Sequence, residues 1–171
     1  DFSPKEQNFK LIEDFEHNFI SLCNGTLLSF DFSHEEKNKI SIENFDYKKE
    51  KNLAKKNSLN FLNHALASGG FSLEISENYK LKKPLVIYNN FSNLLKETIV
   101  NYKNSIIINE NSELNLINYI DNSSKENFMV NTIENIKMKK NSSLNNILIN
   151  NAKCNGYFYK YIKSDLDKNS N

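Results

Sequence analysis

The sequence contains no arginine and no tryptophan, and all 22 of its basic residues are lysines. They are balanced by 21 acidic residues, so the formal net charge is only +1. Because no basic stripe follows the chain, a protein that tracks a nucleic-acid backbone is not expected. Asparagine and isoleucine are abundant, and both share AT-rich codons with lysine, phenylalanine and tyrosine. A genome of that base composition explains the bias without a functional role for asparagine.

Cysteine is also scarce. Cys23 and Cys154 lie near opposite ends of the chain, with no Cys-x-x-Cys motif and no Cys/His cluster. A structural zinc or cluster site needs four converging soft ligands, so we expect no metal-binding and no cofactor-binding residue in this segment. Two reduced thiols in a cytosolic protein fit best, while a single long-range disulfide stays open.

The chain lacks long apolar runs and the common catalytic motifs. No run approaches the roughly 18 residues needed to span a bilayer. A phosphate-binding loop, a Gly-x-Ser-x-Gly elbow and a His-Glu-x-x-His helix are all missing, so we expect no catalytic residue and no enzyme activity. No signal peptide or initiator Met is present, and the sequence begins at Asp1, so an excised piece of a longer protein is expected, while a naturally short chain stays open.

A few polar and aromatic side chains are candidates for a site. The histidines stand alone and are interpreted as packing or surface residues: His17, His34 and His64. Carboxylate pairs in polar segments are interpreted as solvated: Glu35 with Glu36, and Asp165 with Asp167. An alternating aromatic set is compatible with stacking of sugars or bases, although a strand with one aromatic face is favoured: Tyr157, Tyr159 and Tyr161.

The N-terminal third shows a helix signal followed by a hairpin signal. Ser3-Pro4-Lys5-Glu6 has the features of a helix start, and apolar residues from Phe9 to Phe19 follow at helical spacing. Asn24-Gly25 then separates two alternating apolar segments, which predicts a type I′ hairpin. Phe19 fits both the helix and the first strand.

A polar stretch and a second helix come next. Residues 33–57 are charged and lack a hydrophobic period, so they predict a long surface connection. An apolar face then predicts a helix that ends in a glycine C-cap at Ser68-Gly69-Gly70. The residues of this face are Leu59, Leu62, Ala65, Leu66 and Ala67.

From Gly70 onward the helical period disappears, and about nine short strands are predicted at spacings of roughly 8–14 residues. Their apolar segments are Phe71–Ile75, Leu85–Tyr88, Ile99-Val100, Ile106–Ile108, Leu114–Ile120, Phe128–Thr132, Ile136 with Met138, Leu144–Ile149, and Tyr157–Tyr161.

An internal repeat lies within these strands. Ile106 and Leu114, around the motif Asn111-Ser112, recur at one constant offset as Ile136 and Leu144 around Asn141-Ser142. A looser copy from Ile75 to Leu81 precedes the first at a slightly larger offset. Periods of about 20–50 residues are typical of solenoids, so Leu114 is predicted to stack on Leu144 and Ile106 on Ile136. A sandwich or barrel also uses such strands, but is not expected to give a constant offset.

Residues 62–75, which run Leu-Asn-His-Ala-Leu-Ala-Ser-Gly-Gly-Phe-Ser-Leu-Glu-Ile, resemble the helix and first strand of the SufB/SufD family of iron–sulfur cluster assembly scaffolds. Leu81-Lys82-Lys83-Pro84-Leu85 is similar to the family's Leu-x-x-Pro-Leu step, and the hairpin around Asn24-Gly25 resembles an element of the D subunit more than of the B subunit. The resemblance covers about residues 18–163. No position matches the family's cluster-forming Cys and His residues, which belong to later repeats.

The resemblance implies a mainly β fold, an incomplete right-handed parallel β-helix (solenoid) over residues 70–163. A helix–hairpin region (residues 1–69) precedes it and a polar tail (residues 164–171) follows. The whole protein is then expected to be a non-catalytic scaffold of the SUF complex, which assembles the iron–sulfur cluster with a SufB-type subunit and a SufC-type ATPase. No nucleic-acid or membrane partner is expected, and the compartment is a bacterial cytoplasm or, alternatively, a plastid stroma. The alternatives are a β-solenoid carbohydrate-active enzyme and a protein-binding repeat module.

Overall fold

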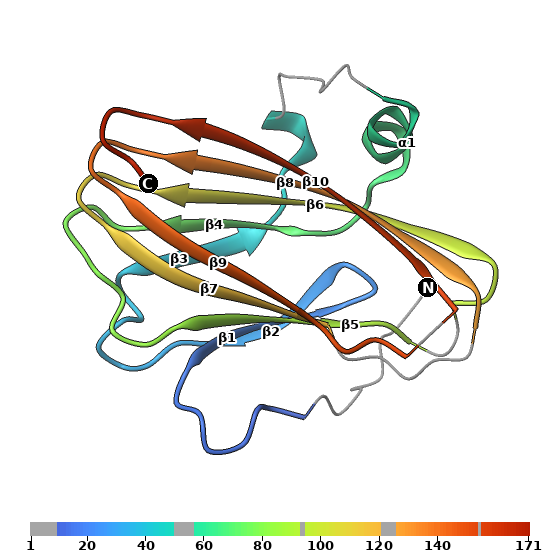
Figure 1. Ribbon diagram of the computed structural model, residues 1–171, viewed down its shortest axis with the longest axis horizontal. Helices are drawn as coiled ribbons and strands as arrows, with labels where there is room; N and C mark the ends of the chain where they lie inside the picture. Colours follow the sequence, from blue (N-terminus) through green and yellow to red (C-terminus); the bar gives the residue numbers. More distant parts are fainter. Residues whose placement is uncertain (1–9, 50–56, 93–94, 121–125, 154) are drawn as a thin grey trace.

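The computed structural model describes residues 10–49, 57–92, 95–120, 126–153 and 155–171 (Figure 1). It is mainly β, with ten strands, one α-helix and one short 3-10 helix in the described residues. The elements are β1 (Asn18–Cys23), β2 (Thr26–Asp31), β3 (Ile40–Asn44), η1 (Tyr47–Lys49), α1 (Ser58–Leu66), β4 (Phe71–Ile75), β5 (Leu85–Asn90), β6 (Thr98–Ile108), β7 (Glu113–Ile120), β8 (Phe128–Met138), β9 (Ser143–Asn150) and β10 (Tyr157–Leu166).

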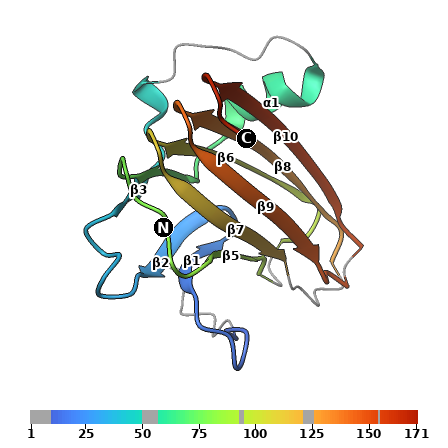
Figure 2. The ribbon, with the colours of Figure 1, turned by 60° about the vertical axis from the view of Figure 1, so that its left-hand side comes forward.

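The strands form two five-stranded sheets that lie one over the other (Figures 1 and 2). Sheet I has the order β2-β1-β5-β7-β9, and sheet II has the order β10-β8-β6-β4-β3. From β4 onward, successive strands alternate between the two sheets, and neighbours in each sheet run parallel. Among the strands of the described residues, only the outer strands β2 and β3 pair antiparallel with their neighbours.

The predicted repeat is confirmed by the strand register. Ile106 of β6 pairs with Ile136 of β8, and Leu114 of β7 pairs with Leu144 of β9, so both pairs keep the same offset along the chain. Ile75 of β4 pairs with Ile108 of β6, which confirms the looser copy with its slightly larger offset.

The core fills the space between the two sheets. Alternate residues of β4 are buried, and Phe71, Leu73 and Ile75 are at most 1% exposed. Ile106 and Leu114 are also fully buried, from opposite sheets. Burial of one such side chain stabilises the fold by about 1.5–3 kcal/mol, so the inward positions of each repeat hold the sheets together.

A column of asparagines marks the turns after the four parallel strands of sheet II, β4, β6, β8 and β10. Asn78, Asn111, Asn141 and Asn169 all have φ values between +56° and +59°. The Nδ2 of each later asparagine donates to the Oδ1 of the one before, over 2.9, 2.9 and 3.2 Å. Asparagine tolerates the left-handed region better than other residues with a Cβ, so the backbone conformation of these turns explains why asparagine occupies them.

The Asn24-Gly25 hairpin is confirmed. β1 and β2 pair antiparallel, and both turn residues have positive φ (+49° and +79°), as a type I′ turn requires. β1 also pairs in parallel with β5, which joins the hairpin to sheet I.

The predicted N-terminal helix is wrong where it can be examined. Residues 1–9 lie outside the described part of the chain. Residues 10–17 contain no helix, and Phe19 belongs to β1. Ile20 and Leu22 are buried at the inward-facing positions of β1. Pairing of this strand with β5 therefore outweighs the helical spacing of the upstream phenylalanines.

The predicted polar connection over residues 33–57 is also partly wrong, since it contains β3 and η1. Ile40 of β3 is buried, and its strand pairs with β4 along the edge of sheet II. Only two isoleucines alternate there, which is too weak a pattern to stand out among charged residues. Residues 50–56 lie outside the described part.

The helix at residues 58–66 is confirmed, but its buried face and its C-cap were predicted wrongly. Asn60 and Asn63 are the buried residues of α1, whereas Leu66 is 58% exposed. The C-cap is Ala67 in an extended conformation, with its N–H donating to Asn63 O. Asn57 caps the other end, where its side chain accepts from Asn60 N.

Gly70 serves close packing instead of a cap. Its φ is +110°, and a Cβ at this position would collide with the carbonyl oxygen of Lys103 on β6. The predicted strand boundaries change as well. Segments 99–100 and 106–108 form one strand, β6, and segments 128–132 and 136–138 form β8. The predicted tail is shorter, because β10 runs to Leu166.

Candidate functional site

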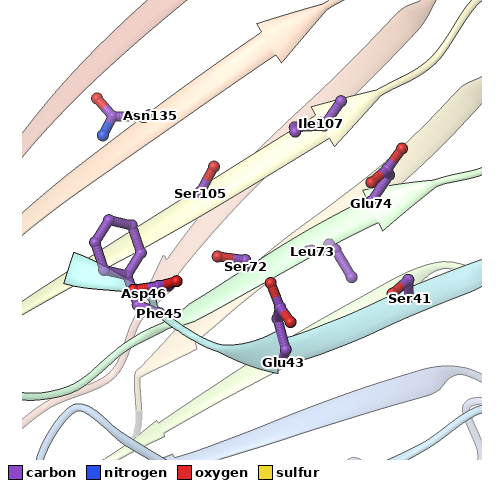
Figure 3. A pocket seen from close by; sticks show the side chains of 10 residues that line it. All are labelled: Ser41, Glu43, Phe45, Asp46, Ser72, Leu73, Glu74, Ser105, Ile107 and Asn135. Carbon is purple, nitrogen blue, oxygen red and sulfur yellow. The ribbon is translucent and has the colours of Figure 1, made fainter. Parts of the chain in front are cut away.

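An open groove of about 350 Å³ lies on the outer face of sheet II (Figure 3). Strand register lays four of its residues in one row across β3, β4, β6 and β8: Glu43, Ser72, Ser105 and Asn135. Glu74 and Ile107 belong to the next row. Because these positions point outward from adjacent strands of one sheet, side chains from sequence-distant segments meet on one surface.

The groove is acidic at its β3 end. Glu43, Asp46 and Glu74 line it, and no lysine is among its lining residues, all of which lie in the described part of the chain. Glu74 Oε1 accepts a hydrogen bond from Asn109 Nδ2 over 2.7 Å. Asp46 Oδ1 accepts from the backbone N–H of Lys48 over 3.0 Å.

A buried lysine lies two residues before the groove along β6. Lys103 is 0% exposed and is covered by η1 and α1. Its Nζ lies 2.5 Å from His64 Nδ1 and 5.7 Å from the centre of the Tyr47 ring. The Lys103 ammonium is thereby held by an imidazole and a ring face, a combination that sequence spacing does not reveal because α1 reaches β6 only in the folded chain.

The three histidines do not converge. His64 lies on α1 against Lys103, whereas His17 Nε2 lies 2.8 Å from the hydroxyl of Tyr88 on sheet I. His34 is exposed in the connection after β2. The interpretation of these residues as separate packing or surface positions agrees with this arrangement.

One carboxylate of the predicted solvated pairs is not solvated. Glu36 is 0% exposed and accepts from Asn18 Nδ2 (2.7 Å), Ser33 Oγ (3.0 Å) and the backbone N–H of Lys82 (2.6 Å). It therefore ties the connection after β2 to the start of β1. Glu35 is exposed, and the Lys82 ammonium beside it lowers the pKa of its carboxyl.

The pair near the C-terminus is exposed, as expected. Asp165 forms an ion pair with Lys163 (3.3 Å), and Asp167 Oδ1 accepts from the backbone N–H of Lys168. Neither carboxylate lines the groove of Figure 3. The residues that line it lie on β3, β4, β6, β8 and the connection between β3 and η1.

The tyrosines of β10 differ in their surroundings. Tyr157 is 77% exposed, whereas the Tyr159 hydroxyl meets α1, accepting from Asn57 Nδ2 (2.6 Å) and lying 3.4 Å from Asn60 Oδ1. Phe158 points inward to the rings of Phe91 and Phe128. Tyr159 thus contacts the helix on one face of β10, and Phe158 packs into the core on the other.

The described residues contain no group of three or more His, Cys, Asp or Glu side chains that could hold a metal ion. Cys23 is buried in β1, and burial raises the pKa of its thiol. Cys154 lies outside the described residues, so the disulfide question stays open. No helix in the described ranges is long and apolar enough to cross a membrane.

Comparison of the sequence with protein-family models and with curated proteins finds no match.

Proposed function

We propose that this chain is part of a non-catalytic scaffold subunit of the SUF iron–sulfur cluster assembly complex, folded as a right-handed parallel β-helix. The observation that carries the proposal is the strand register. Strands alternate between two sheets and pair in parallel with their counterparts one repeat away, as successive turns of a β-helix do.

The segments that resemble the SufB/SufD family lie at positions in the fold that agree with the resemblance. α1 leads through Gly69 and Gly70 directly into β4, the first strand of the parallel repeat. The Leu81–Leu85 step leads into β5, and β1 of the Asn24-Gly25 hairpin pairs in parallel with β5. These positions support the D-type assignment over the alternatives.

By this proposal the complete protein acts with a SufB-type subunit and a SufC-type ATPase in a bacterial cytoplasm or a plastid stroma. The cluster is the product of the complex, and this segment holds no cofactor of its own. Affinity purification of the tagged protein from its native cells tests this. Stoichiometric recovery of both partners supports the proposal, and recovery of neither contradicts it.

One observation favours a second candidate, a β-solenoid carbohydrate-active protein. The groove of Figure 3 offers Glu43, Asp46 and Glu74 beside hydroxyl and amide groups. Carboxylates and hydroxyls on a flat sheet are suited to a polyhydroxylated chain. Oligosaccharide binding that disappears in a Glu43→Gln variant, with no SUF partner recovered from cells, decides for this candidate.

A further inference from the structure

The dipeptide Asn-Gly occurs twice in the sequence, at Asn24-Gly25 and at Asn155-Gly156. It is chemically labile, because glycine has no side chain to keep its backbone nitrogen away from the side-chain carbonyl of the preceding asparagine. Attack by that nitrogen requires rotation about the ψ and χ1 angles of the asparagine. The surroundings of each asparagine in the fold therefore decide how easily the reaction takes place.

Asn24 is held in one conformation from several sides. Its Oδ1 accepts from the backbone N–H of Ser92 over 2.9 Å, and its Nδ2 donates to Ser92 Oγ over 3.2 Å. Its backbone N–H donates to Asn90 O over 2.9 Å. Gly25 is buried against the ring of Tyr102, with which a Cβ at this position would collide. Rotation of Asn24 towards the nitrogen of Gly25 would break these contacts of the turn.

Asn155 has different surroundings. It is exposed and lies in an irregular bend between β9 and β10. Gly156 is half-buried and also lies outside the strands. Neither residue takes part in the strand pairing that the structure describes, so the rotations that bring Gly156 N onto the Asn155 side chain disrupt no ladder of backbone hydrogen bonds.

We propose that Asn155-Gly156 is a site of spontaneous deamidation, whereas the fold protects Asn24-Gly25. The backbone nitrogen of Gly156 attacks Cγ of Asn155, and the new C–N bond closes a succinimide ring. The Cγ–Nδ2 bond breaks, and the amino group leaves as ammonia with the proton of the attacking N–H. Water then adds to one of the two ring carbonyls and opens the ring to aspartate or isoaspartate. The net reaction consumes one water, releases one ammonia and needs no oxidant or reductant.

The product differs from the original chain in backbone length and in charge. In the isoaspartyl form, the main chain passes through the former side chain and gains one carbon atom. This extra atom lies two residues before Tyr157, where the pairing of β10 with Met129 of β8 begins. Both forms add one carboxylate and so lower the formal net charge from +1 to zero, which separates the modified chain from the original by ion exchange.

Incubation of the folded chain at mildly alkaline pH, followed by peptide mapping with mass spectrometry, tests the proposal. Cleavage after lysine places Asn155 as the only asparagine of peptide 154–160. Its conversion is expected to be at least about tenfold faster than that of Asn24, which corresponds to a barrier lower by about 1.4 kcal/mol. In concentrated urea the two rates are expected to converge, because the fold no longer distinguishes them. Asn151, exposed in the same connection but followed by Ala152, is the internal control and should stay unmodified.

The Gly156→Ala variant places a methyl group beside the attacking nitrogen and is expected to slow conversion of Asn155 at least about tenfold. The same slowing is expected in urea, so this comparison does not depend on the fold of the variant. Lys153→Arg, which keeps both the dipeptide and the cleavage site, is the matched control and should leave the rate unchanged. Equal rates at Asn155 and Asn24 in the folded chain, or undiminished conversion in Gly156→Ala, would overturn the proposal. An Asn155 that reacts in urea but not in the folded chain would overturn it as well.

Discussion

The side-chain amide of Asn141 donates to the Oδ1 of Asn111 over 2.9 Å, and the two residues have nearly the same left-handed φ, +57° and +56°. They lie at corresponding turns of adjacent repeats, each just before a strand of sheet I. This hydrogen bond depends on the register of the repeats, because a shift of register would separate the two amides. The same two residues also have the left-handed backbone conformation that the turn requires.

Substitution of Asn141 tests the conformational part of this contact. Asn141→Ala is expected to lower the free energy of unfolding by about 1–2 kcal/mol, since alanine is strained in the left-handed region. Asn141→Gly should lose less, because glycine adopts this conformation freely. Asn145→Ala, at an exposed position on β9, is the control. Urea unfolding measures all three, and an alanine variant as stable as the glycine variant would refute the explanation.

Gly70 tests the close approach of β4 to β6. Gly70→Ala is expected to lower the free energy of unfolding by at least about 3 kcal/mol, because the new Cβ collides with the Lys103 carbonyl and φ is +110°. Ser68→Ala, at an exposed neighbouring position, should change it by less than about 0.5 kcal/mol. Similar unfolding midpoints for the two variants would contradict the packing described here.

Asn63 tests which face of α1 is structural. Its Nδ2 donates to the backbone oxygens of Tyr102 (3.1 Å) and Asn131 (2.6 Å). Asn63→Leu is expected to cost about 1–3 kcal/mol through unsatisfied buried carbonyls. Leu66→Asn, on the exposed face of the same helix, should be nearly neutral. Thermal unfolding followed by circular dichroism measures both variants. If Leu66→Asn destabilised the protein more than Asn63→Leu, the buried face of α1 would be the apolar one predicted from the sequence.

Tyr102 is expected to make the stability of the folded state depend on pH. Burial raises the pKa of its phenol to about 12, above the ordinary value of 10.0 that applies to the unfolded chain. Since the folded state binds this proton more tightly, its contribution to stability is complete below pH 10 and is lost as the pH rises towards 12. Absorbance titration should show one of the eight tyrosines ionising last, and Tyr102→Phe should remove that step. Titration of all eight near pH 10 would contradict it.

Much of the repeat was predictable from the sequence, because it depends on local patterns. Ile106 and Ile136 recur with a constant offset, and parallel pairing preserves that offset as register. The Asn24-Gly25 turn has a conformational requirement that few residue pairs meet. These local patterns predict the structure because they do not depend on contacts with distant segments of the chain.

The remaining features depend on contacts between distant segments. Asn63 is buried because backbone oxygens of β6 and β8 face it, and no periodicity encodes such acceptors. The charged neighbours of Glu36 predict a solvated carboxylate, but it closes the contact between β1 and the loop before β5. Lys103 and Glu134 were not singled out either, because charged residues within strands are ordinarily interpreted as outward-facing.

The proposed role in cluster assembly is tested most directly by depleting the protein from its native cells and measuring the activity of iron–sulfur enzymes. The account predicts that a [4Fe–4S] dehydratase loses activity while its polypeptide level stays constant, and that a metal-independent enzyme in the same extract is unaffected. Restoration of the gene should restore the activity. Undiminished activity of iron–sulfur enzymes in depleted cells, under conditions where no second assembly system operates, would contradict the scaffold function.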